Sequence, residues 1–551
     1  MIFYFSETLK NIEQYDGIHL LQDHVGTGFR APWDDYDYII TFQVFYVQKL
    51  DKKKLGNIKL LSKDSKDTSA KFKDSERKIT EKIYNISNIL KPEDFVSIGE
   101  DIDYYKRIQS IYEYPENENF LGLICDIGYY RQNLTKYKEW GGYNGSLMRG
   151  SSSKVIVDKG FQIALGRYIA KKNIDFKIDT LGNTFEPITF NFNRDRLIGE
   201  SNICLLIGKN GVGKSHILKE ISELVTGLKN NSNTFPALHK LIVIAFSPFE
   251  NFYSYKQIFN LLDEKYSNNK INKKSLKRKR MYINEYSYIG FKNEEGEFDL
   301  NYPIKRSIES LIKIIKYDQD NFWWNPDKTR FSILKETLKL CMDFDEIYIK
   351  NHLKEEILVS HETPFRNIKD HLEYNYQLIF KKNNRELSLS SGQIIYSYIL
   401  PAIMAEIEEE SLLILDEPEL YLHPELEVNL ISMIKNILSE TKSYSIIATH
   451  SSIIAREVDR QSINILRKNH DITKVFKPSI ETYGESIENI ISEVFDDNYI
   501  KKPYQNEIDT FINSENFSLE NASRMIGDDA LIHVLSKIKK EDEEIIIEVE
   551  K

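Results

Sequence analysis

The sequence predicts an α/β fold built around a parallel sheet. Three short apolar runs predict buried strands, and each is followed by a helical pattern. These runs lie at 203–207, within SLLILDEPE (411–419) and within SYSIIATHS (443–451). Strands that alternate with helices in this way form parallel sheets, because each crossover helix returns the chain to the same end of the sheet.

Composition limits the kind of protein. The chain has 551 residues, enough for several domains or for one large core with insertions, and 41% of them are hydrophobic. Its formal net charge is −10, so any contact with nucleic acid must come from local basic patches. Three scattered cysteines, Cys125, Cys204 and Cys341, argue against a disulfide framework or a zinc site.

The sequence also predicts the compartment. No stretch approaches the roughly 18–20 apolar residues of a membrane span, and the N-terminus lacks the features of a signal peptide. Together with the scattered cysteines, these features predict a cytoplasmic protein with no membrane segment. A nucleotide-binding subunit docked on a separate membrane protein remains compatible with this pattern.

A phosphate-binding loop follows the first predicted strand. GKNGVGKS (208–215) fits G-x-x-x-x-G-K-[ST] at every position. Backbone N–H groups of such a loop cradle phosphates, the Lys214 ammonium can reach the β- and γ-phosphates, and the Ser215 hydroxyl can bind Mg²⁺. A helix expected to begin near Lys214 adds the positive end of its dipole. The predicted nucleotide contacts here are Gly208, Lys209, Asn210, Gly211, Val212, Gly213, Lys214, Ser215 and His216.

Two carboxylates end the second predicted strand, Leu412–Leu415. Asp416 at the end of the strand can hold Mg²⁺, directly or through water, and Glu417 can orient and deprotonate an attacking water. Pro418 ends the strand and fixes the turn. D-E-P alone is also compatible with an acidic surface turn, but the upstream phosphate loop favours the catalytic interpretation.

A histidine follows the third predicted strand, Tyr444–Ala448. His450 is expected where this strand ends near the nucleotide, and its imidazole could sense the γ-phosphate or hold the water. A structural turn histidine is the alternative, and the order of the motifs favours function. His423 precedes Pro424, which is expected to start a helix, and both a capping role and an interface contact stay open for it.

Four motifs now stand in order along the chain: GKNGVGKS, LSSGQ (389–393), LLILDEPE and ATHS. This set resembles the ATP-binding-cassette class of ATPases. The resemblance implies heads that dimerise head to tail around two ATP molecules, so that the LSSGQ loop of one copy completes the phosphate loop of the other. Carried over here, Ser390, Ser391 and Gly392 would contact the ATP of the other copy. Gln393 would begin the signature helix, which points its N-terminus at that γ-phosphate.

The variant of the motifs narrows the resemblance. Transporter subunits usually read D-E-P-T followed by a leucine-aspartate loop, whereas this chain reads DEPELYLHPELE (416–427). That segment is similar to soluble ATPases of the overcoming-lysogenization-defect, RecF-like and Septu-type groups. A looser pattern of ATPases from anti-phage systems, including Septu and retron-linked ones, is matched by FVSIGEDIDYYKRI (95–108), IAFSPFENF (244–252) and YSYIGFKN (286–293).

The resemblance implies a function and partners. It implies a cytoplasmic ATPase that forms a dimer or higher oligomer, uses ATP and Mg²⁺, and hydrolyses ATP slowly. It further implies regulation of a separately encoded nuclease of the HNH type in bacterial anti-phage defence. Nucleic acid, including retron DNA, and a reverse transcriptase are additional implied partners. A RecF-like DNA-repair or recombination ATPase is the alternative, and a transporter's energising subunit is a less favoured one.

The predicted fold class is therefore an α/β, ABC-type P-loop ATPase head with additions. A strand-rich N-terminal region (1–160) is expected to be part of the head or docked on it. The first half of the ATPase (161–250) carries the phosphate loop, and a largely helical insertion (251–385) carries a basic run. The second half (386–490) carries the signature, DEPE and His450, and a helical C-terminal tail follows (491–551).

A basic run, NNKINKKSLKRKR (268–280), lies in the predicted insertion of this acidic protein. Mutual repulsion makes such a run unfavourable unless it is solvated or faces an anion. Phosphate backbones are an obvious anion, and binding would then weaken steeply with salt. A solvated loop is the equally weighted alternative. The candidate nucleic-acid contacts are Lys274, Lys277, Arg278, Lys279 and Arg280.

Overall fold

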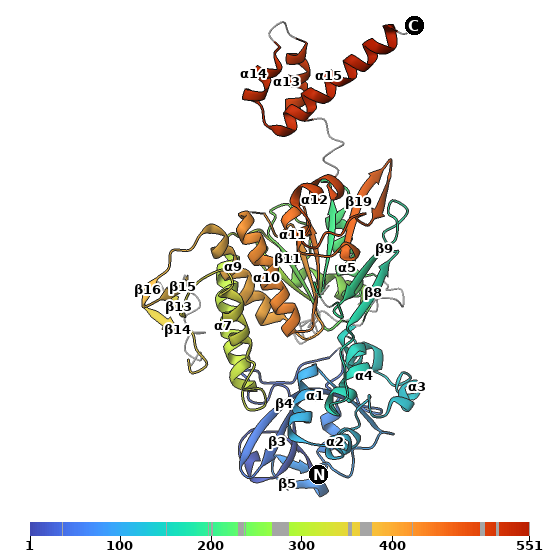
Figure 1. Cartoon of the computed structure of the whole chain (residues 1–551). Helices are drawn as coiled ribbons and strands as arrows, with labels where there is room; N and C mark the ends of the chain where they lie inside the picture. Colours follow the sequence, from blue (N-terminus) through green and yellow to red (C-terminus); the bar gives the residue numbers. More distant parts are fainter. Residues whose placement is uncertain are drawn as a thin grey trace. The chain divides into compact units, whose positions relative to one another are not determined.

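The structure is a computed structural model. It describes the whole chain except residues 36, 150, 197, 200–201, 230–235, 237, 267–285, 351–354, 364–376, 421, 496–501, 514–516 and 550–551. The described chain divides into two compact units, 1–484 and 485–551. Figure 1 shows the elements of both units in sequence colours.

Seven strands near the N-terminus form the first sheet, in the order β5-β6-β1-β2-β3-β4-β7. They span Phe3–Ser6 (β1), Gly17–Gln22 (β2), Thr41–Gln48 (β3), Asp51–Ser62 (β4), Lys78–Thr80 (β5), Ile83–Asn85 (β6) and Phe95–Gly99 (β7). Helices follow at Ile102–Ile111 (α1), Glu116–Leu123 (α2), Leu134–Tyr137 (α3) and Ser151–Ala164 (α4). The sheet and these helices share one apolar core. Because the strands end at Gly99 and helices follow, the region is strand-rich only in its first part.

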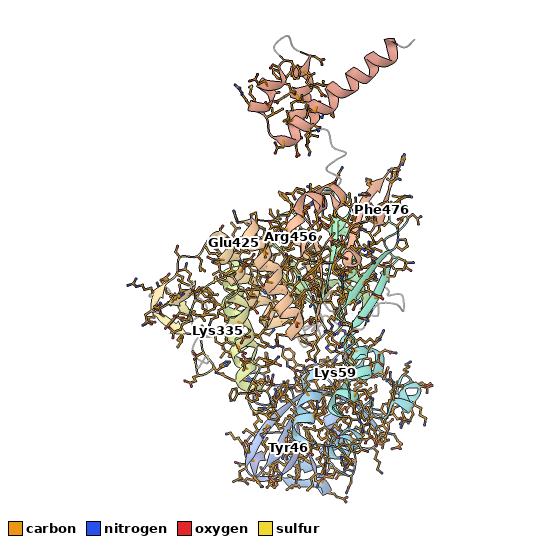
Figure 2. The ribbon with its side chains drawn as sticks, in the orientation of Figure 1. Tyr46, Lys59, Lys335, Glu425, Arg456 and Phe476 are labelled. Carbon is orange, nitrogen blue, oxygen red and sulfur yellow. The ribbon has the colours of Figure 1, made fainter. Side chains whose placement is uncertain are left out.

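The central sheet is the α/β sheet that the sequence predicted. Its order is β12-β11-β17-β18-β10-β19-β20, and every pair except β19–β20 is parallel. The strands span Ile203–Gly208 (β10), Leu241–Ala245 (β11), Tyr286–Gly290 (β12), Leu412–Asp416 (β17), Tyr444–Thr449 (β18), Ile463–Asn469 (β19) and Ile472–Phe476 (β20). Figure 2 labels Phe476 on β20, and Tyr46 on β3 of the N-terminal sheet.

The register of the central sheet brings the motif-bearing strand ends together. Ala245 pairs with Asp416, Asp416 with Ala448, and Ile207 with Thr449. Because these neighbours are parallel, the segments that follow β10, β11, β17 and β18 all leave the same edge of the sheet. This edge carries the candidate site.

Helices cover the central sheet. Helix α5 (Lys214–Val225) and α6 (Tyr255–Tyr266) contribute apolar side chains to a core with β10, β11 and β17. Strand β17 is buried on both faces of the sheet. Leu412 and Ile414 belong to this core, and Leu413 and Leu415, which point to the other face, are also fully buried. Helices α7 (Tyr302–Asn321), α9 (Ser391–Glu406) and α10 (Pro424–Glu440) lie side by side (Figure 1), and α9 contacts both others.

The predicted insertion, 251–385, is more mixed than expected. Besides α6, α7 and α8 (Arg330–Leu338), it contains β12, which is an outer strand of the central sheet. It also contributes to a four-stranded antiparallel sheet of Glu346–Lys350 (β13), Glu356–Leu358 (β14), Gln377–Lys382 (β15) and Arg385–Glu386 (β16). Short strands such as YSYIG are difficult to predict, because five residues are too few to establish a periodicity.

Two predicted boundaries fall inside helices. The one at 160 lies within α4, which begins in the polar stretch RGSSSK and continues through the buried residues Val155, Ile156 and Val157. The one at 490 lies within α12 (Ile487–Val494), while the division between the two compact units is at 484–485. Burial against the rest of the core, which a local polar stretch does not reveal, explains the difference at α4.

The remaining elements are a hairpin, a short helix and the C-terminal unit. The hairpin joins Asn173–Ile178 (β8) to Ile188–Asn193 (β9), and α11 spans Ser452–Arg456. The C-terminal unit contains α12, Pro503–Ile512 (α13), Leu519–Met525 (α14) and Asp528–Val549 (α15). Among the described helices, none is both long and apolar enough to cross a membrane.

Candidate active site

The phosphate loop connects β10 to α5 at the carboxyl edge of the central sheet. Gly211 and Gly213 have φ angles of 80° and 103°, a left-handed backbone that favours glycine. A Cβ at Gly213 would lie 2.5 Å from the ring of Phe185, and one at Gly208 would lie 2.6 Å from the Leu466 carbonyl oxygen. The loop therefore needs the bare backbone that a phosphate cradle uses.

Lys214 is the first residue of α5, at the position predicted from the sequence. Its ammonium donates to the carbonyl of Gly208 at 2.9 Å and lies 2.6 Å from Nε2 of His450. Burial lowers the pKa of Lys214, and the carboxylates of Glu417 and Asp416 partly offset this. Both hydrogen-bond partners can be neutral, so an anionic phosphate would compete well for this ammonium.

Asp416 ends β17 and is 6% exposed. Burial raises the pKa of its carboxyl to about 6, against the opposing effect of a hydrogen bond from the Ser215 hydroxyl. Within the described chain, Oδ1 of Asp416 is buried and has no hydrogen-bond partner. A buried carboxylate oxygen without a donor, beside a serine hydroxyl, is a donor set that suits Mg²⁺. Ser215 and Asp416 thus fit the predicted metal. The described residues contain no cluster of three or more His, Cys, Asp or Glu side chains that could hold a metal ion.

Glu417 follows Asp416 in a left-handed conformation, with a φ of 49°. Its Oε1 lies 3.3 Å from Nε2 of His450 and 3.9 Å from Nζ of Lys214. The Glu417 side chain is 28% exposed, so water can reach it. Three predicted residues from the start of α5, the end of β17 and the loop after β18 therefore meet at one edge of the sheet.

His450 is held in its neutral form. Burial lowers its pKa below the ordinary 6.5, and the nearby Lys214 ammonium lowers it further, whereas Glu417 acts in the opposite direction. A neutral imidazole can accept the hydrogen bond that Lys214 donates, which assigns the ring proton to Nδ1. When a phosphate binds, the Lys214 ammonium can therefore exchange its hydrogen bond to the imidazole for one to the phosphate, and His450 keeps its charge unchanged.

The residues of the signature loop make their hydrogen bonds to other parts of the chain than Lys214, Glu417 and His450. Ser390 caps α9, and the side chain of Gln393 accepts from its N–H at 3.0 Å and donates to the Cys341 carbonyl at 2.9 Å. Ser391 is exposed, and its side chain has no hydrogen bond to any residue that the structure describes. A Cβ at Gly392 would lie 2.3 Å from Leu426, so α9 begins close against α10.

Two further sequence expectations can be compared with the structure. Helix α10 begins at Pro424 as expected, but its N-cap residue, His423, makes no capping hydrogen bond with its side chain. The basic run 268–280, with the five candidate nucleic-acid contacts, lies outside the described residues.

Phe185 is a site residue that the sequence did not suggest. It lies in the β8–β9 connection and stacks on His216 of α5, with ring centroids 5.4 Å apart and planes at 24°. A phenylalanine in a polar loop carries no motif, so only folding reveals that it packs against the phosphate loop. His216, which was predicted as a nucleotide contact, therefore has its ring engaged by this phenylalanine.

Comparisons with known proteins bear on this site. The family described as "AAA domain, putative AbiEii toxin, Type IV TA system" matches residues 343–456, which include the signature, Asp416–Glu417 and His450. Similar solved structures include the ATP-binding cassette of an ABC transporter in its ADP conformation (16% identity, 60% of this chain and 100% of that chain, TM-score 0.27). Another is the SMC head domain from Thermotoga maritima (12% identity, 56% and 100%, TM-score 0.27).

The central sheet and the motifs that it carries form the fold of an ABC-type P-loop ATPase head. Its α/β sheet carries the phosphate loop, the aspartate–glutamate pair and the histidine on adjacent strands. Over most of its length the chain is also similar to Protein ea59 of Escherichia phage lambda, at 24% identity over 490 residues, 84% of each chain.

Proposed function

We propose that this protein hydrolyses ATP in a head-to-tail dimer, in which each ATP is held by the phosphate loop of one copy and the signature loop of the other. The observation that carries the proposal is a division of the site residues. Lys214, Glu417 and His450 converge at one edge of the sheet, while Ser391 is exposed at the start of α9 and contacts none of them.

The convergent residues have distinct roles in the proposed reaction. A water oxygen bonds to the γ-phosphorus, the bond from that phosphorus to the bridging oxygen breaks, and ADP leaves with the electron pair. Glu417 takes the proton of the water, and Lys214 neutralises charge on the phosphates. His450 accepts a hydrogen bond from Lys214 and so holds the ammonium beside Glu417 before substrate arrives. Ser215 and Asp416 would hold Mg²⁺, which supplies positive charge to the phosphate oxygens when bound.

The cellular role is the finer part of the proposal. ATP-driven closure of the dimer would hold or license a separately encoded HNH-type nuclease in anti-phage defence, with slow hydrolysis setting the lifetime of the closed state. Retron DNA and a reverse transcriptase are further proposed partners, in the cytoplasm. Support comes from the DEPELYLHPELE variant and the anti-phage sequence pattern. The toxin–antitoxin wording of the matched family and a similar phage protein are compatible with this role.

Mixed dimers test the head-to-tail site directly. Lys214→Ala removes a phosphate contact, and Ser391→Arg places a bulky cation at the proposed dimer interface, so each variant alone is expected to lose most ATP turnover. In a heterodimer of the two, one site combines the intact phosphate loop of the second variant with the intact signature of the first. Mixing the two inactive variants should therefore restore a substantial fraction of turnover, measured as released phosphate.

Controls make this experiment decisive. Ser388→Arg changes another exposed serine of the same loop and should leave turnover within about twofold of wild type, as expected for a surface substitution. If Ser391→Arg retains full turnover, or if mixing restores nothing although both variants fold and associate, the head-to-tail site is wrong. Co-purification with the product of an adjacent nuclease gene tests the cellular role; a clean absence of association favours the DNA-repair alternative.

A further inference from the structure

The last carboxylate of DEPE has no role in the proposed reaction. Glu419 lies in the turn after Pro418, two residues beyond Glu417. Its Oε1 accepts a hydrogen bond from the Thr449 hydroxyl at 2.8 Å and another from the backbone N–H of His450 at 2.6 Å. A side chain from the β17 turn therefore holds the backbone of the loop that carries the site histidine.

The hydrogen bonds around Thr449 have a fixed direction. The N–H of Ser451 donates to the Thr449 hydroxyl oxygen at 2.9 Å, so this oxygen is an acceptor on that side. Its only proton is then free to go to Glu419. Three consecutive residues, 449–451, are thus connected by hydrogen bonds to one another and to Glu419.

Glu419 holds the loop where the sheet no longer can. The last ladder contacts between the strands are the pairing of Asp416 with Ala448 and the hydrogen bond from the Glu417 N–H to the Ala448 carbonyl, at 2.9 Å. Beyond this point the β17 and β18 backbones part, and on the other side of β18 the pairing with β10 ends at Ile207 and Thr449, one residue before His450. The bonds from Glu419 span this gap, and bonds to an ionised acceptor are about twice as strong as neutral ones.

The setting of Glu419 indicates a specific use rather than general polarity. Burial raises the pKa of its carboxyl, and the hydrogen bonds from His450 and Thr449 oppose that rise. In the described chain its Oε2 is buried without a partner. Such a group is unfavourable for folding, so its placement indicates that another property depends on it. The threonine of D-E-P-T motifs is shorter and cannot replace a carboxylate as a double acceptor at this reach.

We propose that Glu419 is the positioning residue for His450: its carboxylate orients the loop backbone so that the imidazole lies between Lys214 and Glu417. This inference rests on the proposed ATP hydrolysis. Glu419 touches no reacting atom in it and acts through the histidine. Loss of Glu419 should therefore impair turnover while leaving ATP binding at the phosphate loop nearly intact.

A double-mutant cycle tests the inference. Glu419→Ala should lower kcat about 10- to 100-fold, the size expected when a catalytic arrangement is displaced, with the KM for ATP changed less than about twofold. In a His450→Ala background the same substitution should cost less than about twofold more, because both act through one element. Glu419→Gln keeps one acceptor oxygen and should therefore retain most of the activity that Glu419→Ala loses.

Asp459 offers a matched control. It also accepts one backbone N–H, from Gln461, and one hydroxyl, from Ser462, both at 2.9 Å, and it is 3% exposed. Asp459→Ala should lower stability at least as much as Glu419→Ala and leave kcat within about twofold. If Glu419→Ala keeps wild-type kcat, or if its loss multiplies with that of His450→Ala, the positioning role is refuted.

A second measurement keeps this test separate from the proposed function. If the wild-type chain hydrolyses no ATP, the proposed function fails, and the role of Glu419 is then read from the His450 imidazole by NMR titration. Release of the loop in Glu419→Ala should expose the ring and move its pKa up toward 6.5. An unchanged His450 titration in that variant would refute the positioning role independently of turnover.

Discussion

Two glutamates flank strand β17 of the central sheet, and they have the same unusual backbone but opposite surroundings. Glu410, two residues before the strand, has a φ of 56°, and Glu417, directly after it, has a φ of 49°. Left-handed backbone at a residue other than glycine costs on the order of 1–3 kcal/mol and persists only where the surroundings enforce it. The two glutamates differ in the contacts and the solvent exposure that this backbone conformation gives their side chains.

At the first end, the strain is offset by structure. Glu410 is 3% exposed, and its carboxylate accepts from the Tyr168 hydroxyl and pairs with Lys159 of α4. Its N–H donates to the Thr441 carbonyl at 3.1 Å. The turn between the signature helix and β17 is thereby held by the helical part of the N-terminal region.

At the other end, the strained backbone places the Glu417 side chain in the candidate active site. Glu417 is 28% exposed on its side chain, lies close to Lys214 and His450, and is open to water. One strand thus has a buried structural acid before it and the proposed catalytic acid after it. The comparison teaches that backbone strain marks a residue as constrained, while its partners and exposure determine the kind of constraint.

The largest expected effect separates the two glutamates by chemistry. Glu417→Gln should lower ATP turnover by about 10²–10⁴-fold, because the amide cannot take the proton of the water. The unfolding free energy should change by less than about 0.5 kcal/mol, as for an exposed substitution. Phosphate release and denaturant unfolding measure the two quantities, and size-exclusion chromatography with ATP should detect trapped dimers. Unchanged turnover would remove Glu417 as the base.

The next effect separates them by stability. Among the described residues, Lys159→Met leaves the buried Glu410 carboxylate with the Tyr168 hydroxyl as its partner, so we expect a loss of about 2–3 kcal/mol in unfolding free energy. The control is Lys52→Met, which breaks the more exposed pair of Lys52 with Glu13 and should cost no more than about 1 kcal/mol. Denaturant titration of both variants measures the difference. Equal losses would show that the Glu410 end is not specially held.

The smallest effect concerns Asp416, the residue of β17 next to Glu417. Because its folded pKa, about 6, lies above the unfolded 3.8, its charged form is unfavourable in the fold at neutral pH. Asp416→Asn should therefore stabilise the nucleotide-free protein by about 1 kcal/mol above pH 6. The gain should shrink as the pH falls below about 6 and disappear below 3.8, where the wild-type carboxyl is protonated in both states. A gain that does not depend on pH would contradict this explanation.

The candidate site could be predicted in part because its chemistry is local. GKNGVGKS specifies its own turn, and the strands that end at Asp416 and Thr449 are apolar runs followed by polar motifs. Parallel strands leave the same sheet edge, so these motifs had to converge once the sheet formed. Phe185, Glu419 and Glu410 could not be predicted, because each matters only through a partner distant in the chain: His216, His450 and Lys159.

The sequence by itself determined the class of the central sheet, the order of its motifs and the phosphate loop, because strand alternation and glycine requirements act over a few residues. Only the tertiary structure decided that β12 joins this sheet, that the N-terminal region holds the turn before β17, and that Glu419 holds the loop of His450. These features depend on side chains that meet across long stretches of chain, where neighbouring residues carry no signal of the eventual contact.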